Sequence, residues 1–236
     1  MERKAKPKII VIMPAYNAEK TLEKTYRDIP LGLVDEIILV DDKSRDSTVK
    51  IAQKLGLTVF VHPNNLGYGG NQKTCYWEAL KRKPDIVVML HPDYQYDATL
   101  IGELVKPIVD NRFDIMLGSR IRTRKEALEC GMPLYKYLGN RVLTIIENLI
   151  LGLNLSEYHT GYRAYKRKVL EAIPFQKFSN DFVFDQQMLI VAAKYGFKIG
   201  EIPVSVRYFP EASSINFKKS LKYGAETLLN LFLRSK

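Results

Sequence analysis

Three side chains in the run His91-Pro92-Asp93-Tyr94-Gln95 have the types and spacing of metal ligands. In an extended segment, residues two apart share a face, so His91, Asp93 and Gln95 would point the same way. A carboxylate and an amide oxygen suit Mg²⁺ or Mn²⁺, which keep water and substrate phosphates among their ligands. A surface turn explains the same residues, because Pro and Asp are common in turns. On spacing alone, the turn is the favoured interpretation.

An acidic pair and a glycine-rich segment are the next candidates. Asp41 and Asp42 directly follow an apolar run and could bind a ribose hydroxyl or a base. A carboxylate cluster at a helix N-terminus is an equal alternative. Gly67, Gly69 and Gly70 allow a ligand to approach the backbone closely. They match neither the dinucleotide-binding nor the P-loop glycine pattern, so the glycines alone indicate little.

Residues 160–163, Thr-Gly-Tyr-Arg, are interpreted as a loop whose cation could hold a phosphate. An ordinary surface turn is the simpler alternative for this segment. Arg120 also follows a short apolar run, in the sequence Gly118-Ser119-Arg120.

Short apolar runs must position these residues. Four β-branched runs, at 8–13, 36–40, 58–61 and 85–90, are typical of strands buried on both faces. Segments with helical spacing lie between them, at 17–29, 46–55 and 70–82. Strand and helix therefore alternate, which predicts an α/β doubly wound sheet. Ligands bind beyond the carboxyl ends of such strands, where the polar residues described above lie.

The second half of the chain is less regular. A strand is predicted at 114–117 and another at 198–206, with helices over 134–151, 184–195 and 216–236. No internal repeat or clear linker interrupts the chain. A single domain over residues 1–236 is the favoured organisation, with a mainly helical and looped C-terminal portion.

Composition narrows the classes of protein. The chain has 236 residues, a formal charge of +10 and 46% hydrophobic residues, which excludes a disordered chain. Two distant cysteines argue against a disulfide scaffold or a cysteine-rich zinc site. No apolar run reaches the ~18 residues of a membrane-spanning helix, so we expect a soluble, cytoplasmic protein. The basic surplus would attract nucleotide phosphates, anionic lipid or nucleic acid, or simply be a solvated surface. No nucleic-acid motif is present, so nucleic acid is not an expected partner.

Taken in order, the motifs resemble a known family. PAYNAEKTL, ILVDDKSRDST, NNLGYGGN, VVMLHPDYQYD, GSR and HTGYRAYKR resemble family 2 glycosyltransferases of the GT-A fold. The most similar branch is the dolichyl- and polyprenyl-phosphate sugar transferases, the group of dolichol-phosphate mannose synthase. Each motif is weak alone, but the ordered set over about 8–210 is specific. It implies a Rossmann-like, mostly parallel sheet flanked by helices. Residues of about 8–120 would bind the nucleotide sugar, and about 121–236 would form the acceptor side.

The resemblance also implies an activity and a site. The activity is an inverting transfer from a UDP- or GDP-linked sugar to a polyprenyl or dolichyl phosphate or a glycan, with Mg²⁺ or Mn²⁺ on the diphosphate. The metal ligands would be Asp93, Gln95 and His91, and the catalytic residues Asp93, Asp185 and Arg163. Asp185 is the candidate base for a hydroxyl acceptor, whereas a phosphate acceptor needs none. The donor would be bound by Pro14, Ala15, Tyr16, Asn17, Glu19, Asp41, Asp42, Gly69, Asn71, Lys73, Asp93 and Arg120.

The chain departs from the family pattern at three positions. His91 replaces the first Asp of the D-x-D motif, Lys43 replaces a usual glycine, and Gln187 replaces a frequent glutamate. The histidine leaves a second hypothesis open, a catalytically weak or inactive relative that binds sugar nucleotides.

A membrane surface and a second copy of the chain are both kept open as partners. Residues 142–151 and 228–233 are apolar enough to lie on the inner membrane surface or to form core or dimer contacts. Basic residues that could face anionic lipid are Arg3, Lys4, Lys6, Lys8, Lys218, Lys219 and Lys222.

Overall fold

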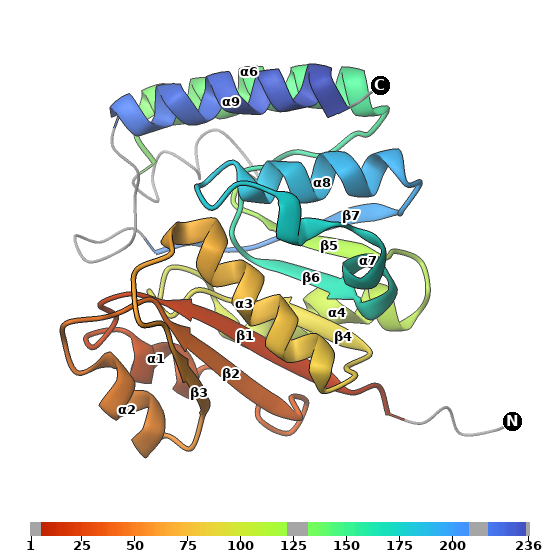
Figure 1. The fold of residues 1–236 in the computed structure, drawn as a ribbon. Helices are drawn as coiled ribbons and strands as arrows, with labels where there is room; N and C mark the ends of the chain where they lie inside the picture. Colours follow the sequence, from red (N-terminus) through yellow and green to blue (C-terminus); the bar gives the residue numbers. More distant parts are fainter. Residues whose placement is uncertain (1–5, 122–131, 208–216, 235–236) are drawn as a thin grey trace, which may run out of the picture.

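A seven-stranded sheet forms the centre of the computed structural model, which describes residues 6–121, 132–207 and 217–234. The spatial order is β3-β2-β1-β4-β6-β5-β7. All neighbouring pairs are parallel except those that β6 makes with β4 and β5 (Figure 1). The strands are β1 (Ile9–Ala15), β2 (Glu36–Asp41), β3 (Thr58–Val61), β4 (Ile86–Met89), β5 (Ile115–Ser119), β6 (Arg163–Lys166) and β7 (Ile199–Pro203).

Helices cover both faces of this sheet. Ile10 and Ile12 of β1 pack into one core with α3, α7 and α8, while Ile9, Val11 and Met13 pack into the other with α1, α2 and α4. Both faces of β1 are buried, which is why its sequence is continuously apolar. The helices are α1 (Leu22–Arg27), α2 (Thr48–Lys54), α3 (Gly67–Lys81), α4 (Ile101–Val109), α6 (Leu134–Leu151), α7 (Arg167–Ala172), α8 (Phe184–Lys194) and α9 (Phe217–Arg234), with 3₁₀ turns η1 (Ala98–Leu100) and η2 (Phe175–Lys177).

The helices α6 and α9 form an additional outer layer. They lie side by side, and both contact α8, which separates them from the sheet (Figure 1). Within the described ranges, no helix is long and apolar enough to cross a membrane.

The predicted strands are confirmed, and most differences concern helices. The helix expected over 17–29 is shorter and spans Leu22–Arg27. Asn17, where the helix was expected to begin, takes a left-handed conformation with φ 52°. The helix α3 begins at Gly67, three residues earlier than predicted. The helices α4 and α7 and the strand β6 are not predicted from the sequence pattern. The predicted loop over 160–163 is wrong for Arg163, which begins β6.

The unusual Lys43 lies in a strained backbone conformation. Its φ of 65° is one that glycine adopts without cost, whereas for other residues it costs roughly 1–2 kcal/mol. We expect Lys43→Gly to raise the free energy of unfolding by about 0.5–1 kcal/mol in urea denaturation, since glycine also loses more entropy on folding. As a control, Lys50→Gly, at an exposed position inside α2, should lower it by about 1 kcal/mol. Equal destabilisation by both substitutions would contradict the strain argument.

Candidate active site

A cleft of about 1450 Å³ opens at the carboxyl ends of β1, β2 and β4 and continues between α6 and α9. Most of the predicted site residues lie on its wall, but five do not. The five are Glu19, Asp41, Gly69, Lys73 and Arg163. The predicted residues that line the cleft are Pro14, Ala15, Tyr16, Asn17, Asp42, Asn71, His91, Asp93, Gln95, Arg120 and Asp185.

The segment 91–95 is a turn, and the turn itself directs the candidate metal ligands. Tyr94 has φ 59°, and Asp93 Oδ1 accepts a hydrogen bond of 3.1 Å from the Gln95 backbone N–H. The segment is therefore not extended, as the spacing argument assumed. His91, Asp93 and Gln95 nevertheless all line the cleft.

The donor set at this turn fits a hard divalent ion with an incomplete protein shell. Across the described part of the chain, no group of three or more His, Cys, Asp or Glu side chains gathers to hold a metal. Asp93 offers a carboxylate and Gln95 an amide oxygen that no described residue hydrogen-bonds. Mg²⁺ and Mn²⁺ accept such a set, because water and substrate phosphates complete the coordination.

Tyr68, the second residue of α3, links His91 to Asp185. Its hydroxyl donates to Asp185 Oδ2 at 2.8 Å and lies 3.1 Å from His91 Nε2, and the two rings stack. Burial raises the pKa of the Tyr68 phenol well above its usual value, and the charge of Asp185 raises it further. The phenol therefore keeps its proton and donates a hydrogen bond to Asp185, so Nε2 is the protonated ring nitrogen that donates to Tyr68. Burial lowers the pKa of His91, against the opposing charges of Asp93 and Asp185, so the ring is neutral and Nδ1 carries a lone pair.

One carboxylate oxygen of Asp185 accepts a hydrogen bond, and the other has no described hydrogen-bond partner. Oδ2 accepts from Tyr68, whereas Oδ1 is buried and has no hydrogen-bond partner among the described residues. Buried polar atoms are normally paired, and Asp185 lines the cleft, so this oxygen could pair with a ligand hydroxyl once a small movement of the side chain uncovers it. Tyr68 was not among the predicted site residues, although it lies inside the glycine-rich segment that the sequence marks.

Arg163 lies behind Asp185 and does not reach the cleft. Its side chain is fully buried and donates to the backbone carbonyls of Thr160 at 2.7 Å, Tyr158 at 3.0 Å and Asp185 at 2.8 Å. Its guanidinium also lies 3.8 Å from Asp185 Oδ2. Arg163 is therefore placed to position Asp185, and it has no direct route to a phosphate.

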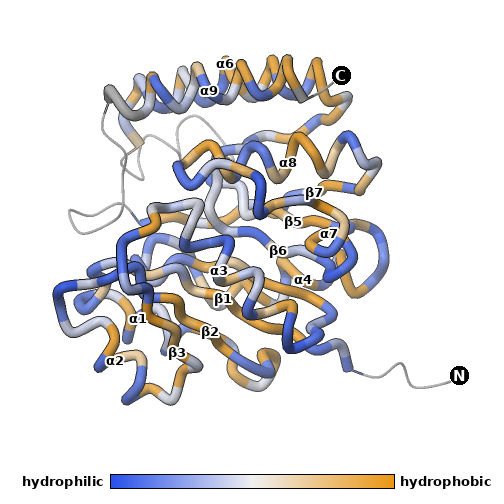
Figure 2. The backbone as a smooth tube through the Cα atoms, in the orientation of Figure 1, coloured by the Kyte–Doolittle hydropathy of each residue, from blue (hydrophilic) through white to orange (hydrophobic). Residues whose placement is uncertain are grey.

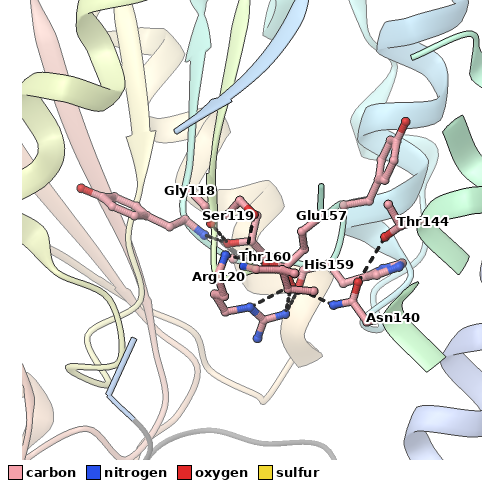
Figure 3. A network of polar contacts seen from close by, with 12 residues as sticks. Gly118, Ser119, Arg120, Asn140, Thr144, Glu157, His159 and Thr160 are labelled. Atoms are coloured by element: carbon pink, nitrogen blue, oxygen red, sulfur yellow. Dashed lines mark hydrogen bonds and ion pairs between the residues drawn. The ribbon is translucent and has the colours of Figure 1, made fainter. Parts of the chain in front are cut away.

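Arg120, in contrast, is held at the cleft wall by a polar network (Figure 3). Its Nε donates to Glu157 Oε1 at 2.9 Å, and its terminal nitrogen donates to the His159 carbonyl at 2.6 Å. Asn140 of α6 donates to the same Glu157 oxygen at 2.9 Å. Lys136 of α6 also lines the cleft, and burial together with the charge of Arg120 lowers its pKa. Two cations thus meet where the polar part of the cleft joins α6. No sequence motif marks Lys136.

Glu157 makes the stability of this network pH-dependent. Burial alone would raise the pKa of Glu157, but the Arg120 charge and hydrogen bonds outweigh it and lower that pKa. The resulting stabilisation is present above the ordinary Glu pKa of about 4.3 and is lost as the pH falls through the lower folded value. We expect Glu157→Gln to cost about 3–5 kcal/mol at pH 7, because it removes one charge of a buried ion pair, and much less below pH 3. Urea denaturation at both pH values measures this difference.

The matched control is Glu23→Gln, which removes an exposed carboxylate from an ion pair with Arg27. It should change stability by less than about 0.5 kcal/mol at either pH. A Glu157→Gln penalty that did not depend on pH would contradict the assigned role of the charge.

Asp42 uses its carboxylate to build the loop between β3 and α3. It accepts from the backbone N–H groups of Leu66 at 2.7 Å and Gly67 at 3.0 Å, and contacts His62 Nδ1 at 2.9 Å. Asp41 accepts from the Ser44 N–H at 2.8 Å through Oδ2, and its Oδ1 is buried without a partner among the described residues. The two neighbouring carboxylates therefore differ in their hydrogen-bond partners: both of Asp42's oxygens bind the chain, whereas Asp41 keeps one oxygen without a described partner.

Another segment of the chain lies against the backbone of the glycine-rich segment, at the position where the sequence suggested a ligand. Gly69 N–H donates to the Asn180 carbonyl at 2.8 Å, and a Cβ on Gly69 would lie 2.5 Å from the Ser179 carbonyl oxygen. Lys73 donates to the Phe178 carbonyl and, at 2.7 Å, to Asn180 Oδ1. This part of α3 thus holds the segment 178–180 that precedes α8.

Asn17 and Glu19 likewise join two loops. Asn17 Oδ1 accepts from the Arg45 N–H and Glu19 Oε2 from the Ser47 N–H, both at 2.9 Å. They fix the loop after β1 against the loop after β2.

The family sequence model described as Glycosyl transferase family 2 matches residues 10–173. The chain belongs to this glycosyltransferase family. The glycosyltransferase is 32% identical over 203 residues to an uncharacterised protein of Methanocaldococcus jannaschii, covering 86% of this chain and 83% of that protein. It is 30% identical over 217 residues to a UDP-N-acetylglucosamine–dolichyl-phosphate N-acetylglucosaminyltransferase of Methanococcus voltae, covering 85% of this chain and 86% of that enzyme.

Solved structures confirm the GT-A fold of this glycosyltransferase. Glucosyl-3-phosphoglycerate synthase from Mycobacterium tuberculosis with UDP superposes with a TM-score of 0.76 at 22% identity, over 98% of this chain and 81% of that one. The same enzyme with Mn²⁺, UDP and phosphoglyceric acid gives 0.75 at 22% identity, over 98% and 79%. At this identity the likeness shows the architecture alone.

Proposed function

We propose that this glycosyltransferase moves a sugar from a UDP- or GDP-linked donor to a polyprenyl or dolichyl phosphate, with inversion at the anomeric carbon and with Mg²⁺ or Mn²⁺. The observation that carries the proposal is the two-part cleft. Its polar part ends at Arg120 and Lys136, and beyond them the wall is apolar. An acceptor with an anionic head and a long apolar tail matches both parts. The apolar lining residues are Leu138, Val142, Leu143, Leu221 and Leu228.

The relatives support this choice of substrates. The Methanococcus voltae enzyme is named for a UDP-linked sugar and dolichyl phosphate. The structural neighbour was crystallised with UDP, with Mn²⁺ or Mg²⁺, and with a phosphate-bearing acid. The donor nucleotide would lie on the loop after β1, where Pro14, Ala15 and Tyr16 line the cleft next to Asn71.

The reaction needs few proton transfers. Asp93, with Gln95 and His91, would hold the divalent ion, whose charge stabilises the departing nucleoside diphosphate. An acceptor phosphate oxygen, already anionic, attacks the anomeric carbon as the bond to the diphosphate breaks, so no general base is required. Arg120 and Lys136 hold the acceptor phosphate by charge-assisted hydrogen bonds.

Asp185 then has two roles, depending on the acceptor. With a phosphate acceptor, its free Oδ1 accepts a hydrogen bond from a hydroxyl of the bound sugar. With a hydroxyl acceptor, the same oxygen takes the proton as general base. The carboxylate is held in place for either role by Tyr68 and Arg163.

The second candidate function is a sugar-nucleotide-binding protein with little or no transfer activity. It is favoured by His91, which stands where the family has an acidic metal ligand and whose Nε2 is engaged by Tyr68. We further propose that residues 1–236 form a single catalytic domain. This domain would work in the cytoplasm, at the inner surface of the membrane where a lipid acceptor resides.

Two linked measurements test the proposal. A thermal-shift screen of UDP-, GDP-, CDP- and dTDP-sugars with Mg²⁺, Mn²⁺ or EDTA identifies the donor, since a ligand that binds the folded state raises Tm. Transfer of that sugar to farnesyl phosphate, phosphoglyceric acid or farnesol is then followed by mass spectrometry. We expect product with farnesyl phosphate alone. Donor binding without product on any acceptor favours the second candidate, and product only on phosphoglyceric acid overturns the lipid acceptor.

A further inference from the structure

The outer face of the α6–α9 layer is apolar over its whole length. In α6 the exposed apolar residues recur every three or four positions, which places them on one stripe of the helix. In α9 a similar stripe is exposed, and Figure 2 shows apolar residues recurring along both helices. Leu149 is 80% exposed and Leu233 71%. The stripes consist of Leu134, Leu138, Val142, Ile145 and Leu149 in α6 and Leu221, Leu229, Phe232 and Leu233 in α9.

The inner face of α6 is polar, whereas α9 buries one polar and one apolar side chain, Thr227 and Leu231. Thr144 and Glu147 are the fully buried residues of α6, on the side opposite its apolar stripe. Thr227 of α9 is also fully buried, and Glu147 lies 3.3 Å from His159 Nε2. Helices on a water-soluble surface normally bury their apolar side and expose their polar side. The helix α6 has the reverse arrangement, and α9 beside it exposes four large apolar side chains, so we expect this outer face to be covered.

We infer that the outer face of α6 and α9 docks onto an anionic lipid bilayer, with both helices lying in the plane of the interface. Between their first and last residues the two helices carry six Lys or Arg and two Glu; Lys222 is paired with Asp181 and Glu226, Arg141 donates to the Ser156 carbonyl, and Glu147 is buried. This balance complements anionic headgroups and would repel a second copy of the same face. Leu138, Val142 and Leu221 belong both to this face and to the cleft wall. A bilayer covering the face therefore meets the cleft directly.

The docking surface deepens the proposed function, and its use for a lipid acceptor rests on that function. The docking itself requires neither donor nor acceptor. It can therefore be tested while the catalytic proposal stands or falls separately in the thermal-shift and transfer assays.

The experiment is sedimentation of the full chain with vesicles of phosphatidylcholine, alone or mixed with phosphatidylglycerol. The variants are Leu149→Asp and Leu233→Asp, which are remote from the cleft wall. The matched control is Leu31→Asp, which changes a leucine that is 52% exposed in the turn between α1 and β2. We expect binding to the mixed vesicles, weaker binding to phosphatidylcholine alone, and a loss of at least about tenfold in the partition coefficient for each variant in the face. Leu31→Asp should bind as the unchanged chain does.

Two results would overturn the inference. One is that the unchanged chain stays in the supernatant with both kinds of vesicle, or that Leu31→Asp weakens binding as much as the other variants. The second is a dimer in analytical ultracentrifugation that Leu149→Asp and Leu233→Asp dissociate while vesicle binding is unaffected. Circular dichroism and Tm of each variant, compared with the unchanged chain, show that a loss of binding is not a loss of folding.

Discussion

Asp93→Asn will lower the transfer rate by about 10³-fold and abolish the metal-dependent thermal shift with the donor. The substitution keeps the shape of the side chain and its place in the turn, where Oδ1 accepts from the Gln95 N–H. It removes the negative charge that a divalent ion needs. Within the described residues, no group of three His, Cys, Asp or Glu side chains gathers at this turn, so no second carboxylate joins Asp93 and His91 in a metal-binding cluster. Thermal shifts with Mn²⁺ and with EDTA, together with kcat for the identified donor, measure both effects.

Asp97→Asn is the matched control for that experiment. Asp97 lies four residues further on, where its Oδ1 accepts from the Thr99 N–H at 3.0 Å and caps η1. It does not line the cleft, and an Asn side chain caps a helix about as well as Asp, so the substitution should change stability by less than about 0.5 kcal/mol and leave the metal-dependent shift intact. An Asp93→Asn protein that kept the shift would show that the ion is held elsewhere.

Arg163→Met will lower the free energy of unfolding by about 3–5 kcal/mol. The side chain is fully buried, and its loss leaves the carbonyls of Tyr158, Thr160 and Asp185 without their donors. The Asp185 carboxylate also loses its nearest cation. Lysine cannot reach three carbonyls from one ammonium group, so Arg163→Lys should recover only part of the loss. Urea denaturation measures both variants.

An exposed arginine serves as the control for this prediction. Arg112 is paired with Asp110 at the surface, at 3.6 Å, and Arg112→Met should change stability by less than about 1 kcal/mol. If Arg163→Met kept full stability, the stabilising role assigned to the three carbonyl hydrogen bonds of Arg163 would be wrong.

The strands and the polar loops that follow them could be predicted because they depend on local pattern. β1 is apolar throughout since both its faces are buried, and the polar segment 91–95 follows β4. The role of Arg163 could not be predicted in this way. Its motif indicates a cation in a loop, but its burial depends on Asp185, which is distant in the sequence.

The same limit applies to the two acidic neighbours and to the glycines. Asp41 and Asp42 have the same side chain, and only the path of the loop after β3 assigns Asp42 to Leu66 and Gly67. From the sequence, the glycine-rich segment is interpreted as a place where a ligand could approach the backbone. The approaching group is another part of the chain, which composition cannot distinguish from a ligand.

The contact at Gly69 has a consequence for how the chain unfolds. The main chain of α3, in the first half, touches the main chain of 179–180, in the second half, without side chains between them. Neither half can unfold locally without breaking this backbone contact with the other half. We therefore expect the N-terminal and C-terminal halves of the chain to share one cooperative opening, so that a ligand bound to either half also slows hydrogen exchange in the other.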